Sequence, residues 1–90
     1  MERVRIIISG YVQGIFFRTF VRDKATALGL TGYVRNTENG KVEAIVEGHK
    51  NKIKKLIELC REGPPGSDVK NIEIEKEQYQ GEFQNFTIKY

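Results

Sequence analysis

The residues best suited to bind an anion lie in a glycine-containing segment between an apolar run and a helix-like stretch. Its sequence is GYVQGIFFR, at positions 10–18. Gly10 and Gly14 permit backbone conformations that other residues avoid, so consecutive amide N–H groups can converge on one point just before a helix begins. The helix N-terminus adds the positive end of its dipole, and Arg18 supplies a planar fork of donors that matches phosphate oxygens. The segment therefore predicts a phosphate pocket.

A structural role for the same segment is the alternative interpretation. Residues 10–18 would then form a tight strand-to-helix turn, and Arg18 would make a surface ion pair with Asp23 or with a glutamate. Composition alone leaves the two interpretations equally favoured. The segment is neither a Walker motif nor a dinucleotide motif, because no Gly-Lys-Ser/Thr follows it and the G-x-G-x-x-G spacing is absent. A nucleotide ligand is therefore not indicated.

A second polar group, Asn36, is expected near the end of a strand and next to a hairpin. It closes the sequence GYVRN, in which Gly32 permits a close approach of the backbone to its neighbour. The amide of asparagine offers both an acceptor oxygen and donor N–H groups, so Asn36 is a candidate site residue. Taken alone, an asparagine in this position more often bonds its own backbone in a turn. Both roles remain open at this point.

Other common catalytic groups are scarce. His49 is the only histidine and is expected between a strand and a helix, whereas zinc and facial-triad sites need several convergent ligands. Cys60 is the only cysteine and falls on the apolar stripe of a predicted helix, which favours a small core residue over a nucleophile. The carboxylates are scattered and suggest no acid–base pair. We expect no metal site, no cofactor and no internal disulfide.

The elements that must position these residues follow from the hydrophobic periodicity. Alternating apolar residues predict strands, and apolar residues three or four apart predict helices. Asn39-Gly40 is a strong signal for a hairpin between two of the strands. The predicted strands cover residues 4–8, 31–37, 41–47, 69–78 and 86–90, and the predicted helices cover residues 20–28 and 53–60. Residues 10–18 and 63–67 are expected to be loops.

This order of elements is that of the split β-α-β arrangement. It predicts an α+β, ferredoxin-like sandwich in which an antiparallel sheet carries two helices on one face. With 90 residues, the chain is expected to form a single domain over residues 1–90. That fold carries many unrelated activities, so function has to be argued from the site.

Charge and composition narrow the class of ligand. Fifteen Lys and Arg against twelve Asp and Glu give a formal net charge of +3, without a block of like charges. This balance suits a small anionic substrate better than a nucleic acid. A ferredoxin-like RNA-binding module is a rival, but the aromatic RNP-like run of such modules is absent. No apolar segment has the length of a membrane span, and the single cysteine agrees with a reducing compartment, so we expect a cytoplasmic protein. We also expect a monomer, but the sequence does not determine the oligomeric state.

The motifs together resemble the acylphosphatase family, whose members hydrolyse the carboxyl–phosphate bond of acyl phosphates. The similarity extends over nearly the whole chain and keeps the order of the family's motifs. It is carried by residues 10–18, 28–36, 39–43, 48, 63–65 and 86–90. Two departures are mild: Ile15 stands where valine is usual, and Tyr33 where tryptophan is common.

The resemblance implies roles for particular residues. Arg18 would hold the phosphate of the substrate, and Asn36 would position the attacking water; these are the two predicted catalytic residues. The predicted substrate-binding residues are Gln13, Gly14, Ile15, Phe16, Phe17 and Arg18, with the loop amides sharing the phosphate oxygens. The implied partners are an acyl phosphate as substrate and inorganic phosphate as product and inhibitor, without metal, nucleic acid or membrane. The alternative is a module of the same fold that binds phosphate or handles carbamoyl phosphate without being a free-standing hydrolase.

Overall fold

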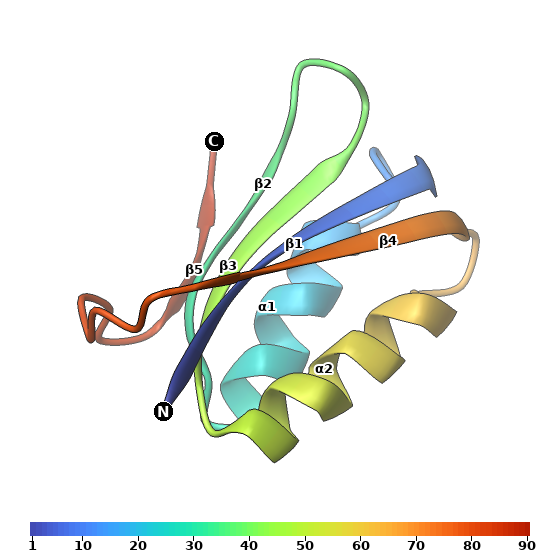
Figure 1. Cartoon of the computed structure of the whole chain (residues 1–90). Coiled ribbons are helices and arrows are strands. Elements are labelled where there is room, and N and C mark those ends of the chain that lie inside the picture. The colour runs from blue at the N-terminus through green and yellow to red at the C-terminus, as the bar shows by residue number, and fades with distance from the viewer.

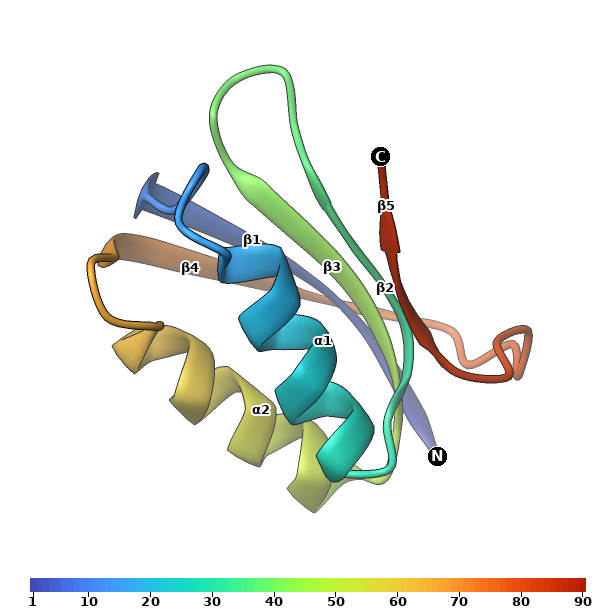
Figure 2. The same ribbon diagram turned by 180° about the vertical axis from the view of Figure 1, so that it is seen from behind.

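The computed structural model describes all of residues 1–90 as a five-stranded sheet with two helices on one face (Figures 1 and 2). The elements are β1 (Glu2–Tyr11), α1 (Phe17–Ala27), β2 (Thr31–Asn36), β3 (Val42–Gly48), α2 (Lys50–Glu62), β4 (Asp68–Glu77) and β5 (Phe86–Lys89). Neither helix combines the length and the apolar character needed to cross a membrane. The order of elements and the two-layer architecture confirm the predicted ferredoxin-like sandwich.

The strand order is β4-β1-β3-β2-β5. Four of the strands form antiparallel pairs, as predicted, but β5 pairs with β2 in parallel, so the sheet is mixed. The cause is the long connection over residues 78–85, which crosses from one edge of the sheet to the other (Figure 1). The chain leaves β4 at the end where β2 begins, so β5 runs in the same direction as β2. The C-terminal strand thereby ends near the Asn36 end of β2.

One hydrophobic core fills the space between the sheet and the helices. Val4, Ile6 and Ile8 of β1 face it, which confirms the predicted alternation. Each helix contributes an apolar stripe: Phe17, Val21 and Ala25 from α1, and Ile53, Leu56 and Cys60 from α2. Burial raises the pKa of the Cys60 thiol to about 12. Cys60 is therefore a core residue and not a nucleophile, as expected.

The start of α1 differs from the prediction. The helix begins at Phe17 rather than Phe20, and β1 continues to Tyr11, so the connecting loop contains only residues 12–16. Phe17 is buried one helical turn before Val21, and this packing extends the helix toward its N-terminus. Arg18 consequently lies in the first turn of a helix and not in the loop.

Gly32 brings β2 unusually close to β3. Its φ is +140°, and a Cβ atom there would lie 1.8 Å from the carbonyl oxygen of Ile45. No other residue fits without moving the neighbouring backbone. The expected close approach is confirmed, and it fixes the strand that ends at Asn36.

Candidate functional site

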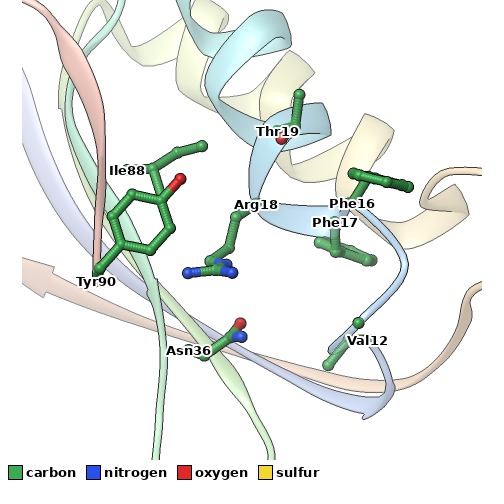
Figure 3. A pocket seen from close by; sticks show the side chains of 9 residues that line it. Val12, Phe16, Phe17, Arg18, Thr19, Asn36, Ile88 and Tyr90 are labelled. Atoms are coloured by element: carbon green, nitrogen blue, oxygen red, sulfur yellow. The ribbon is translucent and has the colours of Figure 1, made fainter.

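A cavity of about 300 Å³ opens at the end of the sheet where the first loop, β2 and β5 meet the N-terminus of α1 (Figure 3). It brings together Arg18 and Asn36, which are 18 positions apart in the sequence. Arg18 is the only charged side chain that lines it. The residues around the cavity are Val12, Gly14, Phe16, Phe17, Arg18, Thr19, Asn36, Ile88 and Tyr90.

The loop at this cavity leaves a run of backbone donors unused. No backbone N–H of residues 13–19 donates a hydrogen bond within the protein, and the first residue before α1 provides no side-chain cap. Gly14 and Phe16 both have a positive φ, 75° and 63°, so the chain turns sharply before the helix starts. Free amides at a helix N-terminus, together with the helix dipole, favour binding of an anion.

Arg18 has no carboxylate partner. Asp23, the partner considered from the sequence, forms its ion pair with Arg22 instead, at 3.2 Å. None of the ion pairs of the protein includes Arg18. Its guanidinium lies over the ring of Tyr90, with Cζ 4.9 Å from the ring centroid. The surface ion-pair interpretation is therefore wrong, and the charge of Arg18 remains available to a ligand.

Asn36 places an unpaired acceptor at the same cavity. Its Oδ1 is buried and has no hydrogen-bond partner. The adjacent hairpin does not use this side chain: the hydroxyl oxygen of Thr37 accepts from Lys41 N at 3.1 Å, and Thr37 N donates to Lys41 O at 2.9 Å. The turn role considered for Asn36 is therefore not the one the protein uses. A buried acceptor without a donor is costly, which favours a ligand or a water as its partner.

Gln13 ties the loop to the hairpin. Its side-chain Nε2 donates to the carbonyl oxygens of Thr37, at 3.0 Å, and Lys41, at 2.9 Å. Because Thr37 follows Asn36 directly, these two bonds hold the loop in register with the end of β2. Neither Gln13 nor Ile15 lines the cavity; Ile15 packs against the core. The other predicted substrate-binding residues, Gly14, Phe16, Phe17 and Arg18, do line it.

Several lining residues were not predicted from the sequence. Thr19 follows Arg18 in the first turn of α1 and would have been identified had the helix start been placed at Phe17. Ile88 and Tyr90 reach the cavity because β5 lies beside β2, a long-range pairing without a local sequence signal. Tyr90 belongs to the motif at residues 86–90, but its contact with the guanidinium of Arg18 follows only from the fold.

The remaining polar candidates lie elsewhere. His49 precedes α2, is exposed and does not line the cavity. The protein contains no group of three or more His, Cys, Asp or Glu side chains arranged to hold a metal ion. The side-chain chemistry available at the cavity is therefore that of one guanidinium, one amide and the hydroxyls of Thr19 and Tyr90, beside the free backbone N–H groups.

Comparison with known proteins identifies the family. The acylphosphatase family model matches residues 4–88. The chain belongs to the acylphosphatase family. It is 43% identical to the acylphosphatase of Pelotomaculum thermopropionicum over 98% of this chain and 96% of that protein. The match confirms the resemblance read from the motifs.

Solved acylphosphatase structures share the whole fold. The crystal structure of the acylphosphatase from Bacillus subtilis superposes with a TM-score of 0.96 at 36% identity and covers 100% of both chains. T. kodakarensis HypF contains a similar region, with a TM-score of 0.86 at 34% identity, which covers 100% of this chain but 12% of that one. The acylphosphatase fold thus occurs both as a chain of about this length and as part of a much longer one.

Proposed function

We propose that this protein hydrolyses the carboxyl–phosphate bond of acyl phosphates, giving a carboxylate and inorganic phosphate. One observation carries the proposal: an unpaired guanidinium, a run of free backbone amides and a buried amide oxygen without a donor all meet in one cavity. Each of these groups lacks a hydrogen-bond or ion-pair partner within the protein. A phosphate with a water beside it would supply all the missing partners.

In this proposal the phosphate occupies the space between the free amides and Arg18. The guanidinium donates to two phosphate oxygens, and each such charge-assisted hydrogen bond contributes about 1.5 to 3 kcal/mol. On one side the guanidinium makes a cation–π contact with the ring of Tyr90. Donors fixed in advance stabilise the charge that develops on the transferring phosphoryl group.

Asn36 would hold the attacking water. Its Oδ1 accepts a hydrogen bond from the water, and its N–H group donates to the phosphate. The water oxygen forms a new bond to phosphorus while the bond between phosphorus and the acyl oxygen breaks, and the electron pair of that bond leaves with the carboxylate. A phosphate oxygen of the substrate takes the proton of the water, because an asparagine amide does not act as a base at neutral pH.

The absence of an Asp, Glu or His side chain from the cavity lining fits this chemistry. A carboxylate leaves as a stable anion at neutral pH, because carboxylic acids have pKa values near 4. An alkoxide leaving group would instead require a general acid. The site should therefore discriminate strongly against phosphomonoesters.

The direct test is an assay of the purified protein with benzoyl, acetyl and carbamoyl phosphates, beside a phosphomonoester. We expect hydrolysis of acyl phosphates, competitive inhibition by inorganic phosphate and no measurable hydrolysis of the phosphomonoester. Hydrolysis of the phosphomonoester at a comparable kcat/KM would contradict the proposed leaving-group chemistry. A crystal soaked in phosphate should contain the ion against Arg18 and the amides of residues 13–17; an ion bound only elsewhere would remove the basis of the proposal.

The second candidate is a module that binds phosphate or handles carbamoyl phosphate, and the similarity to part of HypF favours it. Turnover of carbamoyl phosphate with little activity on other acyl phosphates would support that role. A monomeric, cytoplasmic protein with no nucleic-acid or membrane partner remains a prediction. Size-exclusion chromatography with light scattering tests the monomer, since a measured mass near 10.4 kDa is expected.

A further inference from the structure

Phe16 has a backbone conformation, a helix-capping position and a degree of exposure that are all unfavourable for a phenylalanine. It is the only residue other than glycine with a positive φ, a conformation that costs about 1 kcal/mol or more for a side chain with a Cβ. It precedes the first residue of α1, where Ser, Thr, Asp or Asn would cap the helix, and it makes no capping hydrogen bond. Its side chain is 83% exposed, so burial does not compensate for either cost. A residue that contradicts its local structure in this way is often functional.

Phe16 lies at the rim of the catalytic cavity, across from the residue proposed to hold water. Figure 3 shows Arg18 in the centre of the cavity, with Tyr90 on one side and Phe16 and Phe17 on the other. Asn36 approaches from the sheet, whereas Phe16 comes from the loop that precedes α1. Phe17 is buried in the core and leaves the exposed ring of Phe16 as the aromatic surface on the loop side.

In-line attack determines where the acyl group must lie. Attacking and leaving oxygens take opposite sides of the phosphorus. With the water held on the Asn36 side, the acyl oxygen and the group attached to it point away from the sheet and toward the loop. The rim there contains Phe16 and carries no charged side chain.

We propose that Phe16 forms a subsite for the acyl group and that the protein prefers acyl phosphates with a planar, apolar acyl group, such as an aromatic one. This inference rests on the proposed function and adds a substrate class to it. The exposed ring offers a flat face against which an aromatic acyl group can stack, and the contact removes apolar surface of both partners from water. A short acyl group such as acetyl is too small to use this surface.

The test compares kcat/KM for benzoyl phosphate with kcat/KM for acetyl phosphate. The two leaving groups also differ in acidity, but that difference is the same for every variant, so a change in the ratio reports the subsite. In Phe16→Ala we expect the benzoyl-to-acetyl ratio to fall about 3- to 10-fold, as loss of one aromatic contact implies. Phe16→Leu should lie between the two, because it keeps apolar surface and loses the flat face.

Tyr11→Ala is the matched control. Tyr11 is another exposed aromatic residue, 61% accessible at the end of β1, but it does not line the cavity. The ratio should be unchanged in this variant. Inhibition by inorganic phosphate is measured in every variant as well, because phosphate has no acyl group to contact the ring and therefore reports on the loop alone. Circular dichroism should show the same helix content in all variants.

Three results would overturn the inference. The first is an unchanged ratio in Phe16→Ala. The second is an equal loss of kcat/KM for both substrates with weaker phosphate inhibition, which would mean that Phe16 only shapes the loop. The third is a wild-type protein that hydrolyses neither substrate, which would remove the proposed function as well. Active wild type with an unchanged ratio rejects the acyl subsite alone.

Discussion

The arginines of this protein occupy two contrasting regions. On the face of the sheet opposite the helices, Arg3 contacts Glu47, Glu77 and Glu82, and its Nε lies 2.9 Å from Glu77 Oε1. At the end of the sheet, Arg18 contacts no carboxylate and lies against an aromatic ring. The same side chain is neutralised in one region and left with a free charge in the other.

The open face contains two ion-pair clusters, one around Arg3 and one around Glu43. Arg5 and Arg35 share Glu43, each with its Nε 2.6 Å from one of the two carboxylate oxygens. Glu43 is only 5% exposed and Glu47 only 2%. Oε2 of Glu47 also accepts from the backbone N–H groups of Gln80 and Gly81, which attaches the connection that leads to β5.

The contrast separates groups that hold the fold from groups that await a ligand. A buried carboxylate accepts hydrogen bonds from several donors, and both sides would be left without partners if it were replaced. Changing it therefore affects stability. An arginine without a partner contributes little to the fold, so changing it should affect binding. Arg18 and Asn36 belong to the second kind, although they occupy different elements of the structure.

Arg18→Ala should have the largest functional effect. Removing a guanidinium aimed at the phosphate should lower kcat/KM for an acyl phosphate by about 10²- to 10³-fold or more and abolish binding of inorganic phosphate. The free energy of unfolding should hardly change, because Arg18 makes no ion pair in the protein. Steady-state assays, phosphate calorimetry and urea unfolding measure the three quantities.

Arg5→Ala is the control from the other region. It removes an arginine of the Glu43 cluster that lies on the far face from the cavity and should leave kcat/KM unchanged while lowering the free energy of unfolding by about 1 kcal/mol. A loss of activity in Arg5→Ala comparable to that in Arg18→Ala would show that the two regions are not functionally separate.

Asn36→Ala should separate turnover from binding. We expect kcat to fall by about 10²-fold, because the water loses its orienting group, while inorganic phosphate still binds through Arg18 and the loop amides. Stability should be preserved or slightly increased, since the change removes a buried acceptor that has no donor. If Asn36→Ala and Arg18→Ala lost phosphate affinity equally, the proposed division of labour between them would be wrong.

The paired and unpaired states of these arginines could not be read from the sequence. Residue type and spacing singled out Arg18 and Asn36, and the hairpin at Asn39-Gly40 placed Asn36 correctly at the end of a strand. Twelve acidic residues were available as partners for Arg18, and only the folded structure shows that Asp23 pairs with Arg22. Local patterns identify an element, but ion pairing depends on which elements become neighbours.

The parts of the fold that follow from local sequence periodicity were predictable, and the parts that depend on long-range pairing were not. Strands with alternating apolar residues and an α2 stripe three and four residues apart follow from local periodicity, and both were confirmed. The parallel pairing of β5 with β2 depends on an eight-residue crossing connection, residues 78–85, which has no periodic signal. The start of α1 was misplaced because a left-handed Phe16 contradicts the preferences of its residue type.

Lowering the pH should destabilise the protein through the ion pairs on the open face of the sheet, and not through the groups at the cavity. Burial acts to raise the pKa values of Glu43 and Glu47, but the hydrogen bonds from their donors outweigh it, so both pKa values lie below the ordinary glutamate value. The stabilisation is present above the pKa of the unfolded state, near 4.3, and is lost as pH falls through the lower folded values. Urea unfolding at a series of pH values below 5 should show this decrease.

Glu47→Gln should flatten that pH dependence. The substitution keeps the shape of the side chain but removes the charge that Arg3 and two backbone N–H groups contact, so the free energy of unfolding at pH 7 should fall by about 2 kcal/mol. Catalysis at neutral pH should be retained, since Glu47 does not line the catalytic cavity. A variant with unchanged acid sensitivity would mean that other carboxylates control acid unfolding.

His49→Ala should have no effect on catalysis. His49 is exposed and remote from the lining of the cavity, and the proposed mechanism assigns every step to groups that do not titrate near neutral pH. The pH–rate profiles of the variant and the wild type should therefore superimpose between pH 5 and 8, and treatment with a chelator should change neither profile. The opposite result would be a wild-type rate that depends on a group with a pKa near 6.5, with that dependence lost in the variant. His49 would then act as a base from outside the cavity lining, and it would have to be counted among the functional groups.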